Sequence, residues 1–303
     1  MIPVLFIVSV VVFMIIHLIP GDPAQIMAGP NATPEQLQAL RVRFGLNQPL
    51  WLQYVTWLRN ALSGDMGYSY LNNYPVVDMI VQRVPATVEL AFAAALVGAV
   101  ISFPLGIGAA LKKGGTFDYL CTIYSSLSFA VPGFWLAILL MLLFSLQLHL
   151  LPPSGRPDFA DDPAAHLRAL IMPALAEGIG ISGRLLRYLR ASVAHALAHE
   201  YTRTARGKGL RERAVILRHV LPNALIPVVT VLGLQLGDLL SGAIIIESVF
   251  AWPGVGRLTV QAVGWRDYSL LQADVLFIVL AFLVVNLITD LTYGLLDPRI
   301  RLQ

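Results

Sequence analysis

The sequence predicts an all-α, polytopic membrane protein with six transmembrane helices, a small helical insert outside the membrane and a short helical segment on the cytoplasmic side. Two observations predict this fold. Hydrophobic residues make up 57% of the 303 residues and charged residues only 13%, whereas a soluble domain has about 25% charged residues. Six apolar stretches are also each about as long as the ~20-residue helix that crosses a bilayer.

The six predicted spans are 1–19, 86–111, 119–148, 169–189, 223–247 and 273–296. The third is interrupted at Pro132, and the fourth is the least apolar because it contains Glu177 and Arg184. The first span has no basic residues before it and no convincing cleavage site before Pro20. We therefore interpret it as a retained helix and not as a secretory signal.

The positions of Lys and Arg predict the orientation of the chain. Six spans place both termini on one side, and 13 of the 21 Lys and Arg residues lie in or beside the segments on that side. Such a bias in short loops marks the cytoplasm. The Lys and Arg residues on the cytoplasmic side account for the pI of about 9.1. No nucleic-acid partner is therefore expected. The single cysteine, Cys121, cannot form an intrachain disulfide.

The predicted organisation has three parts, which are a first transmembrane helix at 1–20, an extracytoplasmic insert at 21–85 and a five-helix core at 86–303. In the insert, Thr33 followed by Pro34 and Gln36 is typical of a helix start.

A second insert helix is predicted at 49–62, with Gly64 as its stop. One face of this helix is expected to carry Trp51, Tyr54, Val55, Leu58 and Leu62. Either that face packs on the chain's own helices or it docks a partner.

Small residues recur at every fourth position in three spans, a spacing that lets helix backbones approach closely in lipid. The three sets are Gly98, Ser102 and Gly106; Ala174, Gly178 and Ser182; and Gly233, Gly237 and Ser241. Packing within the chain is the simpler explanation. For the last set, contact with a partner subunit or a position lining a pathway is the alternative.

Ionisable residues inside spans are candidates for function, and they are Glu89, Glu177, Asp238 and Asp290. If the fifth span and its neighbours form a pathway across the membrane, Gln235, Asp238 and Ser241 are the candidate pathway-lining residues, with hydrogen bonds to neighbouring helices as the alternative. Glu247 and Asp274 lie near the outer interface and are predicted to be solvated.

The segment 199–222 is strongly basic and is divided by Gly207 and Gly209. A second helical piece is predicted from Leu210 to Pro222, and its apolar face would consist of Leu210, Ala214, Leu217 and Leu221. Such an amphipathic helix suits a groove on another protein or an anionic lipid surface. Charge alone does not separate the two.

This segment resembles the EAA loop of ATP-binding cassette importer permeases, which reads Glu-Ala-Ala, three residues, Gly, nine residues, Ile, one residue, Leu-Pro. Here Ala205, Gly209 and Leu221-Pro222 match in register, whereas Arg203, Thr204 and His219 replace Glu, Ala and Ile. The string from Tyr201 to Leu210 resembles the peptide-permease version of the loop, which departs from the motif in the same way.

The resemblance covers essentially the whole chain. Stretches similar to dipeptide and oligopeptide (peptide/nickel) permeases, in particular their first or B-type component, occur in order at 17–23, 63–69, 83–90, 132–136, 151–156, 247–257 and 296–301. Each stretch alone is weakly specific, but the ordered set is highly specific.

The resemblance implies a coupling helix and a set of partners. These are a second homologous permease subunit, two cytoplasmic ATPase subunits or domains that carry ATP and Mg²⁺, and an extracytoplasmic solute-binding protein, in a bacterial or archaeal inner membrane. Thr204, Ala205, Gly209, Leu221 and Pro222 occupy the motif positions that contact the ATPase. Arg203, Arg206 and Leu210 are further candidates for this contact. Dipeptides or oligopeptides are the expected cargo, with nickel chelates, glutathione or another small solute as alternatives.

No catalytic, cofactor or metal site is predicted in the chain itself. Gly207-Lys208-Gly209 lacks the spacing and the Ser or Thr of a nucleotide-binding loop, and His195 and His199 lack the Glu of a zinc-protease motif. The more distant alternative is an ion-driven secondary transporter, which would show inverted repeats and broken midplane helices; the sequence has no convincing internal repeat, and Pro132 is its only clear interruption of a span. An intramembrane enzyme would need paired catalytic groups, and none has recognisable spacing.

Overall fold

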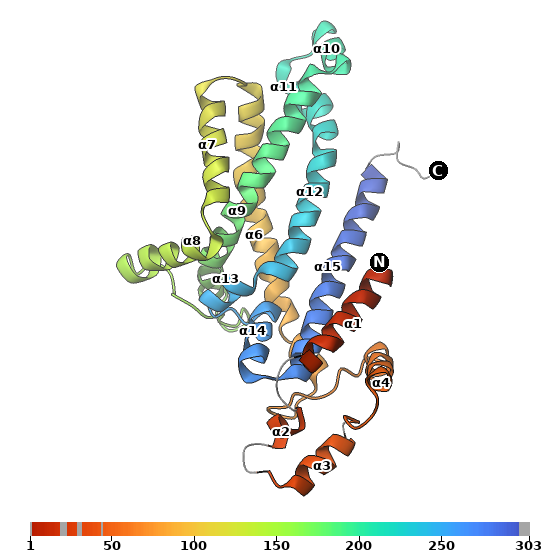
Figure 1. The fold of residues 1–303 in the computed structure, drawn as a ribbon. Coiled ribbons are helices and arrows are strands. Elements are labelled where there is room, and N and C mark those ends of the chain that lie inside the picture. The colour runs from red at the N-terminus through yellow and green to blue at the C-terminus, as the bar shows by residue number, and fades with distance from the viewer. Residues whose placement is uncertain (1, 19–22, 29–31, 44, 297–303) are drawn as a thin grey trace. The chain divides into compact units, whose positions relative to one another are not determined.

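The computed structural model describes residues 2–18, 23–28, 32–43 and 45–296, which form helices joined by turns and loops (Figure 1). The one isolated β-bridge in this part of the chain joins Tyr68 and Pro75. The all-α prediction is therefore confirmed. Contacts divide the chain into two compact units, residues 1–87 with 253–281 and residues 88–252 with 282–303.

Four of the predicted spans are confirmed as helices long and apolar enough to cross a membrane. The helices that form most of these spans are α6 (Val84–Leu111), α9 (Pro163–Ala198), α12 (Leu221–Gly242) and α15 (Tyr268–Leu296). The predicted third span is a bent pair of helical segments. The predicted first span is α1 (Ile2–Leu18), which has 17 described residues.

The smaller helices of the first unit are α2 (Pro23–Ala28), α3 (Pro34–Arg43), α4 (Leu50–Leu62), α5 (Val76–Val81) and α14 (Val255–Trp265). The predicted start of α3 is confirmed in detail. The Thr33 N–H donates to Gln36 Oε1 at 3.0 Å, and the Gln36 N–H donates to Thr33 Oγ1 at 3.4 Å. This reciprocal pair satisfies amide groups that a helix start leaves without partners.

Helix α4 packs on α1, so the prediction of packing within the chain is confirmed for one of its residues. Tyr54 shares a 2.8 Å hydrogen bond with Ser9, and its ring lies 5.4 Å from that of Phe13. Trp57, which the predicted face omitted, lies 5.9 Å from Phe13. Three other residues of the predicted face, Trp51, Val55 and Leu62, are exposed.

Asp267 joins the predicted insert to the start of α15. Its carboxylate accepts the N–H of Leu270 at 3.2 Å, as helix-capping residues do. It also accepts the Ser69 hydroxyl and, at 3.2 Å, the Tyr70 N–H. Burial, and then the nearby Asp267 charge, raise the pKa of Tyr70 to about 12, so its phenol stays protonated at neutral pH. The loop at 69–70 is thereby held against residues about 200 positions away.

The prediction that two acidic residues are solvated is wrong. Asp274 is fully buried and accepts the Thr259 hydroxyl at 2.6 Å within the first unit. Glu247, on α13 (Ile244–Val249) in the second unit, is also fully buried. Sequence position near a span end does not reveal which other parts of the chain bury a carboxylate.

Helix α9 is the centre of the second unit, where α6, α7 (Thr116–Ala130) and α12 pack against it (Figure 1). A Cβ on Gly98 would lie 2.8 Å from Ile181, and one on Gly178 would lie 2.6 Å from Val97. Gly233 likewise faces Thr289 of α15. The small-residue stripes thus serve packing within the chain at these positions.

The break at Pro132 is a sharp bend. Val131 is extended, and α8 (Gly133–Leu140) with the π-helical η1 (Met141–Gln147) leaves α7 at 97°. Pro132 has no N–H to donate, which favours ending α7 before it. Alone, the 15 residues of α7 extend about 22 Å, which is shorter than the ~30 Å hydrocarbon core.

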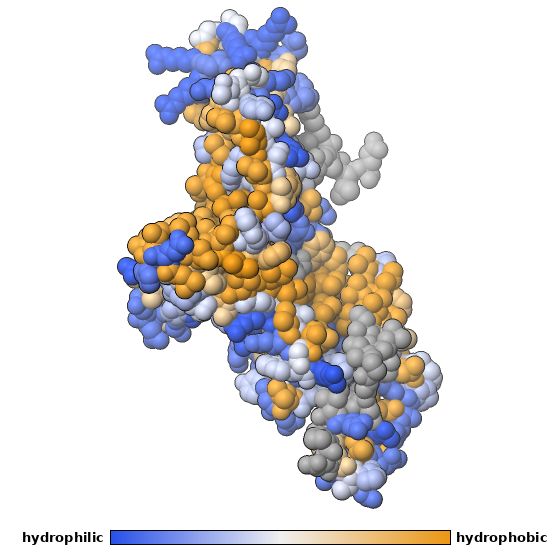
Figure 2. Space-filling view, turned by 60° about the vertical axis from the view of Figure 1, so that its left-hand side comes forward, coloured by the Kyte–Doolittle hydropathy of each residue, from blue (hydrophilic) through white to orange (hydrophobic). Residues whose placement is uncertain are grey.

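The surface of the second unit is that expected of a membrane protein. Phe92, Leu96 and Val100 are four residues apart on α6 and all exposed, so they form one apolar stripe. In Figure 2, hydrophobic side chains form a band over the helices of this unit, and hydrophilic side chains gather at its end formed by α10 and α11. In water such a band would be unfavourable, and in a bilayer it faces lipid tails.

Glu89 is held by two partners, which explains its place inside a predicted span. Arg156 Nε donates to Glu89 Oε2 at 2.8 Å, and His166 Nε2 pairs with the other oxygen. His166 is fully buried, and its Nδ1 lies 2.7 Å from the Pro157 carbonyl. Glu89 therefore fastens the loop before α9 to α6.

Candidate functional site

The basic segment between α9 and α12 consists of three short pieces, α10 (Glu200–Gly207), α11 (Glu212–Val215) and the π-helical η2 (Ile216–Val220). Helix α9 ends because His199 is extended. The Thr202 hydroxyl donates to the Ala196 carbonyl at 2.8 Å, which folds α10 back on the end of α9.

One face of this segment is buried against α9. Ala205, Val215 and Val220 belong to a buried cluster that includes Leu189 and Val193. This cluster connects the segment to the helix that forms the centre of the unit. A displacement of the segment is therefore resisted by side chains of α9 directly.

The predicted start of the second piece at Leu210 is wrong, and with it the prediction of one continuous helical face from Leu210 to Leu221. The second piece begins at Glu212 because Arg211 is extended, with φ −60° and ψ 140°. Leu210 and Leu217 are 43% and 53% exposed, whereas the buried residues are Val215 and Val220. The segment thus presents leucines as well as basic side chains on its outer surface.

Gly209 forms the turn between α10 and α11. Its φ of +76° lies in the left-handed region that favours glycine. Across the turn, Arg206 donates to both carboxylate oxygens of Glu212, at 2.6 and 3.1 Å. The turn therefore sets the angle between two pieces that a charge-assisted pair also holds together.

The other predicted contact residues surround this turn. Arg203 and Thr204 are exposed on α10, and Pro222 is exposed at the start of α12. Ala205 is buried and Leu221 is half-buried. The predicted contact residues thus lie in one segment. Ala205 faces inward, Leu221 is half-buried, and Arg203, Thr204 and Pro222 are exposed.

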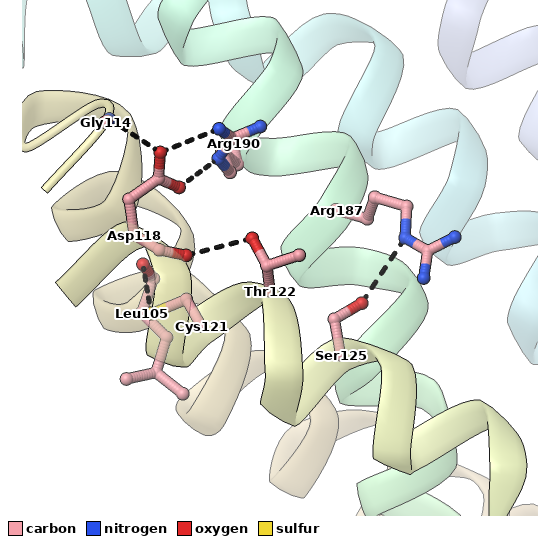
Figure 3. A network of polar contacts seen from close by, with 8 residues as sticks. All are labelled: Leu105, Gly114, Asp118, Cys121, Thr122, Ser125, Arg187 and Arg190. Carbon is pink, nitrogen blue, oxygen red and sulfur yellow. Dashed lines mark hydrogen bonds and ion pairs between the residues drawn. The ribbon is translucent and has the colours of Figure 1, made fainter. Parts of the chain in front are cut away.

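An ion-pair network anchors α9 to α7 (Figure 3). Arg190 donates through Nε to Asp118 Oδ1 and through Nη2 to Asp118 Oδ2 at 2.8 Å. Asp118 also accepts the Gly114 N–H at 2.9 Å, and its side chain is buried. Nearby, the Arg187 Nε donates to Ser125 at 3.4 Å.

A cavity of about 670 Å³ lies within the second unit, between the α7–α8 break, α9 and α12. Apolar residues such as Phe129 and Leu136 line part of it. Its polar and charged lining consists of Ser128, Glu177, Arg184, Gln235 and Asp238.

Two of the three predicted pathway residues, Gln235 and Asp238, therefore lie at one cavity. Arg184 Nη1 donates to Gln235 Oε1 at 2.7 Å and lies 3.5 Å from Asp238 Oδ2. The side chain of Ser241 lies outside the described part of the chain. Sequence reasoning included Glu177 among the candidates for function but treated Arg184 only as a polar residue that weakens a span. Their seven-residue separation, which places both on one helix face, was the missed signal.

Comparison with known proteins gives consistent matches over the chain. Residues 102–302 match the family described as binding-protein-dependent transport system inner membrane component, and residues 1–91 match its N-terminal family. The chain is 40% identical to the glutathione transport system permease protein GsiC of Escherichia coli O6:H1, over 99% of this chain and 96% of that protein. It is 38% identical to the dipeptide transport system permease protein DppB of Alkalihalophilus pseudofirmus, with the same coverage.

Among solved structures, the chain resembles the MetNI methionine ABC transporter in an inward-facing conformation, with a TM-score of 0.56 at 16% identity, covering 72% of this chain and 96% of that one. At this identity the likeness concerns the fold. The family match covers well over half of the sequence, and the relatives agree with it. The chain therefore belongs to the binding-protein-dependent transport system inner membrane components, the permeases of ATP-binding cassette importers.

Proposed function

We propose that this chain is one of two homologous permease subunits of an importer for dipeptides or short oligopeptides. The observation that carries the proposal is the similarity, over nearly the whole chain, to permeases named for dipeptide and glutathione transport. The cargoes in those names share an amide backbone and charged termini. Glutathione is therefore the second candidate, and nickel chelates or other small solutes are the remaining ones.

ATP hydrolysis belongs to partner chains in this proposal. Two cytoplasmic ATPase subunits or domains bind ATP and Mg²⁺, and an extracytoplasmic binding protein delivers the cargo. Both termini and the α10–η2 segment face the cytoplasm, in agreement with the Lys and Arg bias.

The outer surface of the α10–η2 segment is the proposed ATPase contact. Arg203, Thr204, Leu210 and Pro222 are exposed there, so basic and apolar groups are both available to a groove on another protein. On the inner side, Ala205 and Val215 pack into the α9 cluster. A push on the segment would then be transmitted to α9 and α12.

Purification from native membranes in mild detergent, followed by mass spectrometry, tests the subunit assignment. We expect a second six-helix permease and ATPases with nucleotide-binding motifs to copurify. Uptake by the reconstituted complex is then measured for labelled dipeptides, tripeptides, glutathione and a nickel chelate. Recovery of the chain alone would contradict the importer, and uptake of only the nickel chelate would contradict the peptide cargo.

Replacing Gly209 with glutamate is expected to lower ATP-driven uptake at least tenfold while membrane insertion persists. The reason is the φ of +76°, which costs an ordinary residue about 1–2 kcal/mol and so favours a different angle between α10 and α11. The matched control is Gly207→Glu, which adds the same charge two residues earlier at an ordinary φ and in open space. Its loss of uptake should be at most about threefold. Equal uptake by both variants would contradict a role for the turn.

A further inference from the structure

The cavity of the second unit carries charges of both signs. Glu177 and Arg184 come from α9, and Asp238 comes from α12. Ionisable side chains inside membrane spans are unfavourable unless they face a partner or a water-filled space. Here they line a cavity of about 670 Å³, a size typical of small-molecule sites.

Arg184 is oriented so that it can bind an anion. Its Nη1 is directed at Gln235 Oε1 at 2.7 Å, with Asp238 Oδ2 at 3.5 Å. A guanidinium has five N–H donors, and the Arg184 side chain is 48% exposed. The remaining donors are thus available to a carboxylate in the cavity, where paired N–H groups match its two oxygens.

Gln235 supplies a second donor at the same place. Its side chain is 5% exposed, and its Nε2 has no hydrogen-bond partner among the described residues. The amide cannot be turned over to correct this, because its Oε1 accepts from Arg184 and an NH₂ facing the guanidinium would repel it. A buried unpaired donor is costly, and a bound acceptor would remove that cost.

Glu177 lies seven residues before Arg184 on α9, which corresponds to about 10 Å along the helix axis. Between them Gly180 also lines the cavity, and a Cβ built there meets nothing within 4 Å. The space between the acid and the base is therefore open. An extended peptide advances about 3.3–3.6 Å per residue, so its charged termini are about 10 Å apart at three residues.

We propose that this cavity is a transit site for zwitterionic peptides of about three residues. Arg184 and the Gln235 Nε2 bind the carboxylate, Glu177 binds the ammonium group, and Asp238 positions Arg184. The inference rests on the proposed function, since it assigns a polarity to the cargo on its way through this subunit. In this proposal the cavity itself selects peptides whose amino and carboxyl termini are both free, in addition to any selection by the binding protein.

The test uses the complete purified complex and trialanine as the probe. Uptake of labelled trialanine into proteoliposomes is measured with saturating loaded binding protein. Binding of labelled trialanine to the complex in detergent is measured by equilibrium dialysis without binding protein. The variants are Arg184→Gln and Glu177→Gln, and the matched control is Arg187→Gln, which removes an arginine three residues further along α9 that does not line the cavity.

We expect Arg184→Gln and Glu177→Gln each to weaken trialanine binding and to lower uptake at least tenfold. Arg187→Gln should stay within twofold of the unmodified complex. Trialanine amide should not compete for binding. If Arg184→Gln fails to assemble, Glu177→Gln alone decides the matter, because no bond to Arg184 depends on it among those described.

The outcomes separate the two proposals. If the unmodified complex takes up no trialanine or other peptide, the peptide-importer function is overturned. If it takes up trialanine and both cavity variants match Arg187→Gln in binding and uptake, the transit site alone is overturned. Competition by trialanine amide equal to that of trialanine would also overturn the site, because the carboxylate would then not be recognised.

Discussion

Replacing Asp118 with alanine is expected to lower the free energy of unfolding by about 3 kcal/mol, as breaking a buried ion pair does. The side chain of Asp118 is buried and accepts hydrogen bonds from Arg190 and from the Gly114 N–H. Its removal leaves the Arg190 charge without this partner and the α6–α7 turn without its acceptor. Because Arg190 is part-exposed, water recovers some of the loss.

Cys121 provides the measurement, since it is the only cysteine of the chain and is buried one turn from Asp118. Modification of its thiol by a maleimide, followed by mass spectrometry of the peptide, reports how often α7 separates from its neighbours. A loss of about 3 kcal/mol corresponds to roughly a hundredfold faster labelling. The control is Arg187→Ala, because Arg187 makes a longer 3.4 Å bond to Ser125. Unchanged labelling in Asp118→Ala would contradict a stabilising role for the pair.

The membrane helices were the most predictable part of the fold. In lipid every backbone N–H and C=O group needs an internal partner, so a long apolar stretch becomes a helix almost regardless of its neighbours. The predicted span 86–111 corresponds to α6 at Val84–Leu111. The ends were less predictable. Helix α9 runs from Pro163 to Ala198 instead of 169–189, because polar residues at both ends continue a helix that hydropathy alone does not detect.

Long-range pairing was not predictable from one sequence. Asp118 and Arg190 are 72 residues apart, and Glu89 and His166 are 77 apart. A sequence shows that each residue is ionisable and within or near a span, but it does not show which partner the fold brings to it. This is why Glu89 remained a functional candidate.

The prediction for the basic segment failed for a different reason, the assumed number of residues per helical turn. The predicted face of Leu210, Ala214, Leu217 and Leu221 assumed 3.6 residues per turn. The structure instead has an extended Arg211 and then π-helical turns from Ile216 to Val220, which shift the register of every later side chain. The glycine at 209 was correctly recognised as a break, because its role depends on local backbone conformation and not on period.

Two glycines of α9, two residues apart, are expected to respond in opposite directions to the same substitution. A Cβ on Gly178 would lie 2.6 Å from Val97 and 2.8 Å from the Ala94 carbonyl oxygen, which is backbone and cannot rotate away. Gly178→Ala should therefore push α6 from α9 and lower the free energy of unfolding by about 1–3 kcal/mol. Gly180→Ala meets nothing within 4 Å and should raise it by about 0.5–1 kcal/mol, because alanine favours the helix.

Labelling of Cys121 measures this pair as well, since the thiol packs with Ala109 of α6 and Leu186 of α9. Gly178→Ala should speed the labelling, and Gly180→Ala should leave it unchanged or slower. Both variants replace a glycine of α9 with alanine and remove the same backbone flexibility. They differ only in whether the new Cβ contacts α6. Faster labelling in both variants would mean that α9 needs glycine for bending, and slower labelling in both would mean that α6 does not pack as closely as the structure places it.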